Sequence, residues 1–365
     1  MPANKKQKGE NKALLNFSSS VLAIIAGLLF GLLILLFSNP SQAFPGFLMI
    51  LQGSFADGAF GIGQMFYVAT PIIMTGLSVG FAFKTGLFNI GASGQFTMGA
   101  FVAVYIGVKW TWLPDQIHWV VAIIGAAAAG ALWGLVPGLL KAIANVNEVI
   151  SSIMMNYIGM YLVNILVVKN VYDQVKNQSK PVAQSANLPR AGLDQFLGPN
   201  MTIGIFIAIL FVVLIYILIE KTVFGYELKA CGYNPFASKY AGINSKRNIV
   251  LSMVIAGALS GIGGSLLYLA GSGKYIQVLD VIAPEGFNGI FVALLGLSNP
   301  IGILFAGLFI AHITVGGYNL QLYNFVPEVI DIIISAIVYF GAFALLFKTI
   351  IRTLMTNSKK EGEQI

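Results

Sequence analysis

The chain has 365 residues, of which 57% are apolar and only 10% are charged, with a formal net charge of +7. Soluble proteins carry about 25% charged residues, so this composition excludes a water-soluble globular protein. A single cysteine, Cys231, and two histidines exclude a disulfide framework and a Cys-rich metal site, and we expect no metal or other cofactor on this chain.

Apolar runs of about 20 residues recur along the chain, and each is long enough to cross the hydrocarbon core of a bilayer. They predict an all-α polytopic membrane protein with about ten transmembrane helices. The expected spans lie near residues 18–38, 66–83, 88–107, 118–140, 148–168, 201–219, 248–269, 286–298, 301–318 and 327–348. Residues 18–348 then form the transmembrane domain, and residues 1–17 and 349–365 are terminal tails.

The N-terminus has the basic and apolar regions of a signal peptide, but its apolar run is too long, so a retained first helix is expected.

The distribution of basic residues predicts the orientation of these spans. Ten spans place both termini on one side of the membrane, and the loops then carry 15 of the 21 Lys and Arg residues on that side. Because cytoplasmic loops are enriched in Lys and Arg, we expect both termini in the cytoplasm of a multi-pass protein of the cell membrane. The same bias accounts for the net positive charge without a nucleic-acid partner.

Two polar loops interrupt the apolar pattern, an outer loop at 169–200 and an inner, cytoplasmic loop at 220–247. Neither is long enough for a catalytic domain, and no GxxxxGK[ST] motif occurs in the sequence. The chain is therefore not expected to bind ATP through a P-loop or to be an enzyme, and no catalytic residue is assigned.

The third and eighth expected spans look discontinuous. The third opens with a Gly-rich run at 86–95 that is poor in helix-forming residues, and the eighth is short. The two occupy corresponding places in two sets of four spans with opposite orientation, which predicts an inverted repeat. In transporters, paired Gly-interrupted spans mark a solute pathway at the repeat interface.

Polar side chains in and beside these spans are the candidates for a solute pathway. They are Asn89, Ser93, Gln95, Ser152, Asn156, Glu285 and Asn288. The first three lie in the Gly-rich run, where close helix packing is an equally good interpretation. Ser152 and Asn156 of the fifth span lie on one helix face with Glu148. For Glu148 we prefer a role in capping the helix. For Glu285 and Asn288, at the start of the eighth span, an ordinary capped loop is the alternative interpretation.

The inner loop holds the most specific pattern of the chain, TVFGYELKACGYNPFASKYAGI at 222–243. Asn234 can cap a short helix that has Pro235 at its first position, and Gly242 can end it. A helix of about two turns that stands alone between two spans needs a partner surface.

This run resembles the coupling loop in permease subunits of ATP-binding cassette (ABC) importers for branched-chain amino acids, simple sugars and nucleosides. The runs GLFNIGASGQFTMG at 86–99 and NEVISSIMMNY at 147–157 look most like the nucleoside branch. The resemblance implies a non-catalytic subunit that forms half of the translocation pathway for a small neutral solute, with nucleosides preferred. The residues that it implies for coupling to an ATPase are Glu227, Gly232, Asn234, Pro235, Ala237, Tyr240 and Gly242.

The resemblance also implies partners. These are a cytoplasmic ATPase that binds ATP and Mg²⁺, a second permease subunit, identical or homologous, and an extracytoplasmic solute-binding protein. Two alternatives stay open: a permease for simple sugars, and an ion-coupled secondary transporter. The latter needs ion ligands inside the bilayer, for which the sequence offers Glu148, His312 and Asp331. A passive channel has no obvious use for the Pro-initiated helix of the inner loop.

Overall fold

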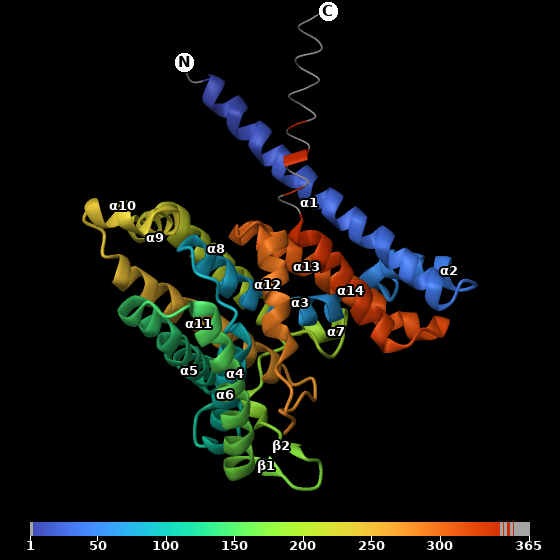
Figure 1. Cartoon of the computed structure of the whole chain (residues 1–365). Helices are drawn as coiled ribbons and strands as arrows, with labels where there is room; N and C mark the ends of the chain where they lie inside the picture. Colours follow the sequence, from blue (N-terminus) through green and yellow to red (C-terminus); the bar gives the residue numbers. More distant parts are fainter. Residues whose placement is uncertain (1–2, 344–345, 347–348, 351–352, 354–365) are drawn as a thin grey trace, which may run out of the picture. The chain divides into compact units, whose positions relative to one another are not determined.

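The computed structural model describes residues 3–343, 346, 349–350 and 353, and this part of the chain is mostly helical (Figure 1). It divides into two compact units, which are described separately: Asp57–His312, and Met1–Ala56 with Ile313–Ile365. Each of the ten predicted spans overlaps a helix, so the all-α polytopic fold is confirmed. The inverted repeat stays a prediction.

The larger unit holds most of the helices. They are α3 (Gly58–Lys84), α4 (Ala92–Lys109), α5 (Asp115–Ala144), α6 (Glu148–Asn170), α7 (Leu193–Leu197), α8 (Gly204–Lys221), α9 (Val223–Tyr233), α10 (Pro235–Tyr240), α11 (Ser245–Tyr268), α12 (Pro284–Leu295) and most of α13 (Pro300–Tyr318). A small hairpin follows α6, in which β1 (Tyr172–Asp173) pairs antiparallel with β2 (Gln178–Ser179). A 3₁₀ turn, Gln184–Ala186, comes next.

The smaller unit is built from α1 (Ala3–Ser38), α2 (Ala43–Gln52) and α14 (Pro327–Ala342), with 3₁₀ turns at Gly53–Phe55 and Asn319–Tyr323. In it α1 packs against α14 through Gly27 and Gly31, where an added Cβ would crowd Ile337 and Ile333. Small residues four apart let two helices approach closely in a membrane, where lipid and side chains are equally apolar. The pairing of α1 with α14 therefore follows from the spacing of Gly27 and Gly31 in α1.

Seven of the described helices are long and apolar enough to cross a membrane: α1, α3, α5, α6, α8, α11 and α13. The eighth span is short, as predicted, since α12 has 12 residues. The helix of the second span starts earlier than expected, at Gly58 rather than near residue 66, because its first two turns are rich in glycine and less apolar. Helix α2 was not predicted.

The predicted tails differ in how far the structure describes them. Helix α1 begins at Ala3 and so includes most of residues 1–17, which were expected to be a tail. The other predicted tail, 349–365, lies almost entirely outside the described residues, as do residues 344–345 and 347–348 near the end of the tenth predicted span.

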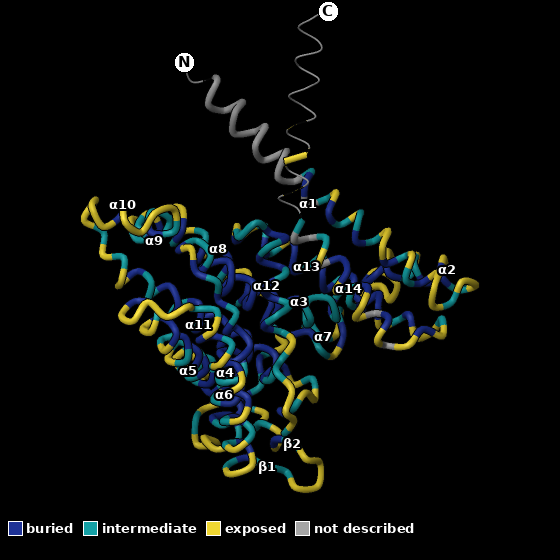
Figure 2. The backbone as a smooth tube through the Cα atoms, viewed as in Figure 1, coloured by how far each residue is buried: buried dark blue, intermediate teal, exposed yellow. Residues whose placement is uncertain are grey.

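The core of the larger unit lies around α3 and α11, which are its most buried long helices (Figure 2). Helix α11 packs closely on α5, where a Cβ on Gly130 would overlap the carbonyl oxygen of Gly257. The opposite face of α5 carries exposed apolar side chains, such as Ile124 and Leu132. A helix with small residues on one face and exposed aliphatic residues on the other is typical of a membrane bundle, in which the second face meets lipid.

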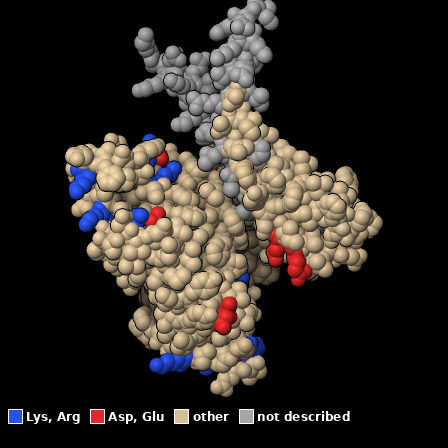
Figure 3. Space-filling model, viewed as in Figure 1, with Lys and Arg blue, Asp and Glu red and all other residues tan. Residues whose placement is uncertain are grey.

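Two opposite ends of the larger unit carry its polar loops. At one end, the last turn of α4 and the segments after α6 and α11 are joined by backbone hydrogen bonds, including Ala183 N to Gly107 O at 2.8 Å and Ser179 N to Ile276 O at 2.8 Å. The other end carries α9 and α10. Lys and Arg gather near these two ends, and the surface between them is largely uncharged (Figure 3). We refer to the two as the hairpin end and the α10 end.

Candidate functional site

The Gly-rich run before α4 is closed by side-chain amides. Asn89 and Gln95 form a pair in which each donates to the other, with Nδ2 to Oε1 at 2.8 Å and Nε2 to Oδ1 at 3.0 Å. Asn89 also donates to Ser78 Oγ on α3, at 3.0 Å. Both amides are completely or almost completely buried. In this structure they hold the irregular segment against α3. This arrangement agrees with the interpretation of the Gly-rich run as a site of close helix packing.

Asn156 on α6 fixes the point at which α4 begins. Its Oδ1 accepts from the backbone N–H of Gly94 at 2.8 Å, and its Nδ2 donates to the carbonyl of Ile90 at 2.9 Å. The first N–H groups of a helix have no partner within the helix, so a neighbouring side chain has to supply one. Asn156 does this for α4, and it is 2% exposed.

Ser93 and Ser152 lie within the same cluster. Both are buried, and within the described part of the chain neither hydroxyl has a hydrogen-bond partner. The start of α12 lies directly on Ser93, because a Cβ on Gly286 would overlap its backbone and hydroxyl. The two spans that looked discontinuous in the sequence therefore meet at their first turns. A role for these serines in contacting solute stays a prediction.

Helix α6 begins differently from the expectation for Glu148. The cap is the preceding residue, Asn147, whose Oδ1 accepts from the N–H groups of Val149 and Ile150. Glu148 instead forms an ion pair with Lys141 of α5, with 2.9 Å between Nζ and Oε2. The preferred capping role was therefore wrong, because a shorter amide side chain one residue earlier has the geometry of a cap.

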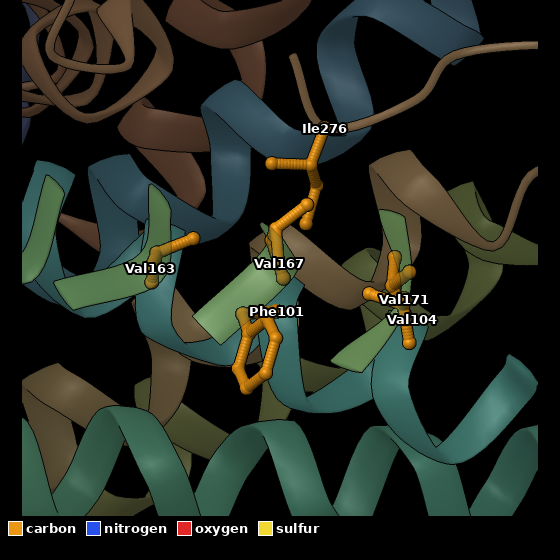
Figure 4. Packing of buried hydrophobic residues seen from close by; sticks show 7 residues of the cluster. Phe101, Val104, Val163, Val167, Val171 and Ile276 are labelled. Atoms are coloured by element: carbon orange, nitrogen blue, oxygen red, sulfur yellow. The ribbon is translucent and has the colours of Figure 1, made fainter. Parts of the chain in front are cut away.

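A cavity of about 430 Å³ lies at the hairpin end, between α4, α6, α11, α12 and the segment that links α11 to α12. Its walls include Phe96, Thr97, Met160, Asn164, Tyr268 and Glu285. We call residues 271–283, most of which line it, the strap. Ile276 of the strap is buried in an apolar cluster with Val104 of α4 and Val167 of α6 (Figure 4).

Glu285 is the one predicted pathway residue that lines this cavity. Its carboxylate accepts from Lys274 Nζ of the strap at 3.0 Å, and its backbone carbonyl accepts from Thr75 Oγ1 of α3 at 2.9 Å. Asn288, one turn further along α12, is half-buried. The pair was expected near the start of the short span, and the structure places both there.

Most cavity residues were missed by the sequence analysis. One signal could have found Asn164, because it lies eight residues after Asn156 and so continues the polar face of the fifth span. Thr97 lies in the run 86–99 that carries the family resemblance. Nothing in the sequence relates Lys274 or Tyr268 to these residues, because the strap folds back over helices that are distant in the chain.

The inner loop folds into two helices rather than the single one expected. Thr222 caps α9 by accepting from Gly225 N at 3.0 Å. As predicted, Asn234 caps α10 with Pro235 at its first position, accepting from the N–H groups of Phe236 and Ala237 at 3.0 Å. Gly242 follows with a φ of +80°, which favours glycine and ends the helix.

The predicted coupling residues fall into two groups. Asn234, Pro235, Ala237, Tyr240 and Gly242 are exposed in and around α10. Glu227 and Gly232 instead contact other helices of the larger unit. Glu227 accepts from Asn248 Nδ2 of α11 at 3.0 Å, and a Cβ on Gly232 would overlap the carbonyl of Lys84 at the end of α3. These two residues fix α9 to the bundle.

Large apolar side chains are exposed along α9 and α10. They are Val223, Tyr226, Tyr233, Phe236 and Tyr240, which are between 68% and 95% exposed. A groove of about 420 Å³ runs between the two helices. Exposed aromatic residues beside a groove are typical of a protein interface rather than of a solvated loop.

No metal centre is indicated in the part of the chain that the structure describes, where no three His, Cys, Asp or Glu side chains come together. Buried His118 is bonded to Ser185 Oγ at 2.8 Å and to the Ile106 carbonyl at 3.1 Å. Of the residues considered for ion coupling, Glu148 is paired with Lys141 and Asp331 is exposed.

Residues 61–347 match the family described as branched-chain amino acid transport system, permease component. The chain is 39% identical to the guanosine ABC transporter permease protein NupP of Bacillus subtilis, over 94% of this chain and 96% of the relative. It is 35% identical to the nucleoside ABC transporter permease protein NupB of Lactococcus lactis, over 94% and 97%. It is 30% identical to the glucose ABC transporter permease protein TsgB13 of Haloferax volcanii, over 89% and 87%. No solved structure gives a significant match.

Proposed function

We propose that this chain, which belongs to the family of permease components of branched-chain amino acid transport systems, forms half of the translocation pathway of an ABC importer for nucleosides. The observation that carries the proposal is its similarity, over 94% of its length, to two proteins named as guanosine and nucleoside permeases. The chain supplies a pathway and a docking surface, and ATP hydrolysis belongs to another subunit.

The chemistry along the proposed pathway supports an uncharged polar solute. The buried polar groups between α4 and α6 are amides and hydroxyls, which hydrogen-bond neutral solutes without adding charge. In the cavity at the hairpin end, the charges of Lys274 and Glu285 compensate each other. A nucleoside has hydroxyls, ring nitrogens and an apolar ring face, and so matches such a lining.

The surface of α9 and α10 supports docking of an ATPase subunit. We define the docking surface as Tyr226, Tyr233, Phe236 and Tyr240 with the groove between the helices. Its aromatic side chains are the kind of anchor that fills a pocket on a partner protein. On this proposal the α10 end faces the cytoplasm, where the ATPase binds ATP and Mg²⁺, and the hairpin end receives solute from a binding protein.

Movement of α9 and α10 has a direct route into the pathway. Gly232 of α9 packs on the end of α3 and the link between α3 and α4: an added Cβ would overlap the carbonyl of Lys84 and lie 3.0 Å from the backbone nitrogen of Gly86. That link, residues 85–91, is the segment held by Asn89, Gln95 and Asn156. On the proposed cycle, closure of the ATPase pulls on α10, and α9 passes this displacement to the start of α4, so access alternates between the two sides.

A second permease subunit, identical or homologous, completes the proposed pathway. Exposed apolar side chains run along α6, including Ile150, Met154, Tyr157 and Ile165, beside the buried polar cluster. In a bilayer such a face can meet either lipid or another subunit. Its position next to Ser152 and Asn156 supports the second subunit, because a pathway shared by two chains has to run beside the polar residues of each.

Permeases for simple sugars are the second candidate, because the chain is also 30% identical to a glucose permease protein. The test is uptake by the complete transporter, co-expressed with its partner subunits in a host that lacks nucleoside uptake. We expect saturable uptake of labelled guanosine that unlabelled nucleosides displace and glucose does not. Substitution of the ATPase catalytic residues is expected to abolish it.

Two results would contradict the proposal. Uptake of glucose, with displacement by glucose alone, would assign the chain to sugar transport. Uptake that persists with an inactive ATPase and collapses when a protonophore removes the proton gradient would assign it to the ion-coupled carriers.

A further inference from the structure

We infer that the cavity beneath the strap is a solute-binding chamber formed within a single permease chain, and that the strap is the gate that closes it on the hairpin side. The inference rests on the proposed function for the identity of the solute, a nucleoside. It adds to that function a binding site and its gate.

The size and lining of the cavity suit a molecule that is part ring and part hydroxyl. A volume of about 430 Å³ falls within the range of small-molecule sites, about 300–1,000 Å³. Phe96, Met160 and Val163 make one part of the wall apolar. Tyr268, Asn164 and Gln178 bring polar side chains to another part.

Thr97 offers a specific contact. Its hydroxyl hydrogen is donated to the carbonyl of Ser93 at 2.8 Å, so towards the cavity its oxygen is an acceptor. An acceptor fits the hydroxyl groups of a ribose, which are donors. A site built around such contacts rejects analogues that lack the donor, because its own polar groups are then left unpaired.

The strap is held over the cavity by contacts that can be broken without unfolding a helix. Lys274 pairs with Glu285 of α12, and Asn164 of α6 donates to the carbonyl of Leu279 at 3.0 Å and to Asp280 Oδ1 at 3.2 Å. The Lys274 side chain is 43% exposed, and ion pairs with an exposed partner are weak. These polar contacts form a latch between the strap and two of the cavity walls.

The strap leaves α11 through a turn that contains two glycines. Gly271 and Gly273 have φ values of +66° and +75°, in the left-handed region that glycine adopts most easily. Ile276 anchors the strap in the apolar cluster of α4 and α6 (Figure 4). Gln277 forms a β-bridge with Gln178, which extends this anchor. Beyond it Leu279 and Val281 are exposed, so residues 278–283 and the first turn of α12 are the part that can swing away while the anchor stays in place.

The chamber lies next to the polar cluster of the proposed pathway. Thr97 in its wall is one helical turn from Ser93, whose buried hydroxyl has no hydrogen-bond partner within the described part of the chain. Gly286, the neighbour of the latch residue Glu285, packs on that serine. A displacement of the first turn of α12 therefore releases the latch and uncovers Ser93 at the same time. Opening of the gate is thereby linked to exposure of the polar cluster around Ser93.

Cysteine labelling tests both parts of the inference, because the chain has one native cysteine, Cys231, and it is buried. The background is Cys231→Ser in the complete transporter. Thr97→Cys and Ala100→Cys each place a thiol in the cavity wall, and Val175→Cys, at a 93% exposed position in the hairpin, is the matched control. The probe is a membrane-impermeant maleimide added from the side of the binding protein.

We expect saturating guanosine to slow labelling of the two cavity thiols at least about fivefold and to leave the control unchanged. Adding Glu285→Gln, which removes the charge of the latch, is expected to speed cavity labelling severalfold. Equal labelling rates with and without guanosine, in a transporter that takes up guanosine, would overturn the chamber. An unchanged rate with Glu285→Gln would overturn the latch. Protection by glucose and not by guanosine would keep the chamber and overturn the nucleoside assignment.

Discussion

Single side chains in this protein replace hydrogen bonds that a regular helix would make for itself. Asn156 satisfies a backbone N–H at the start of α4 and a carbonyl before it, and the pair of Asn89 and Gln95 closes the segment on the other side. In an apolar surrounding each unpaired polar group is costly. An irregular segment can therefore persist in the bundle only while these amides are present.

The substitution Asn156→Leu removes both partners and leaves two buried backbone groups unpaired. Each such group costs about 1–3 kcal/mol, so we expect a clear decrease in the thermal unfolding midpoint of the purified transporter. Asn170→Leu is the control, because that side chain is less buried and bonds within its own helix, to the Leu166 carbonyl at 2.8 Å. Equal midpoints for the two variants would show that Asn156 does not support the segment.

Helices pack here according to where their small residues lie. In the larger unit, α5 and α11 approach through glycines on both helices, and in the smaller unit α1 meets α14 through Gly27 and Gly31. Without a hydrophobic driving force between helices, such close backbone contact supplies the packing energy in lipid. The remaining surface of α5 is apolar and exposed, which makes it tolerant of changes that preserve its hydrophobicity.

This contrast predicts opposite outcomes for two substitutions on α5. Gly130→Val places two methyl groups where even a Cβ overlaps the Gly257 carbonyl, so α5 has to move away from α11. Overpacking costs about 1–3 kcal/mol or more, and we expect a lower unfolding midpoint and lower yield in the membrane. Leu132→Val, on the exposed face two residues away, is expected to change neither. Similar behaviour of both variants would contradict the assigned packing face.

The whole molecule separates its proposed tasks between the two ends of the larger unit. The hairpin end carries the chamber and its strap, and the α10 end carries the docking surface. Between them runs the series of contacts from Gly232 through the link before α4 to Asn156 and Ser93. On the proposed function, this layout connects solute entry at one end of the unit to docking of an ATPase at the other.

A charge placed on the docking surface is expected to release the ATPase and leave the fold intact. Phe236 is 80% exposed, so Phe236→Asp disturbs no internal packing, but it removes an aromatic anchor. Anchors of this kind contribute about 2 kcal/mol or more, which corresponds to about 30-fold weaker binding. Co-purification of the ATPase with the tagged permease measures the effect.

The control is Val175→Asp, which introduces the same charge at the exposed hairpin end. It is expected to retain the ATPase. Retention of the ATPase by Phe236→Asp would exclude α10 as the docking element. Loss of the ATPase from both variants would mean that an added charge impairs the complex regardless of position.

Helices at the positions of the predicted spans, the short eighth helix and the capped α10 followed from the sequence alone, because each depends on local information. A hydrophobic run long enough for a bilayer has to be helical, since every backbone group needs a partner within the segment. An asparagine before a proline marks a helix start by its own geometry. Local patterns were less informative for α2, for the extension of α3 and for the cap at Asn147 in place of Glu148.

Which polar groups meet was decided by the tertiary structure. Asn156 and Gly94 are 62 residues apart, and Asn164 and Leu279 are 115 apart, yet both pairs are hydrogen-bonded. The sequence contains the same asparagines, but their partners are backbone groups, which carry no residue signature. Folding the strap over α4 and α6 created a cavity and a latch from residues that are unremarkable one by one, because shape and pairing exist only once distant segments pack together.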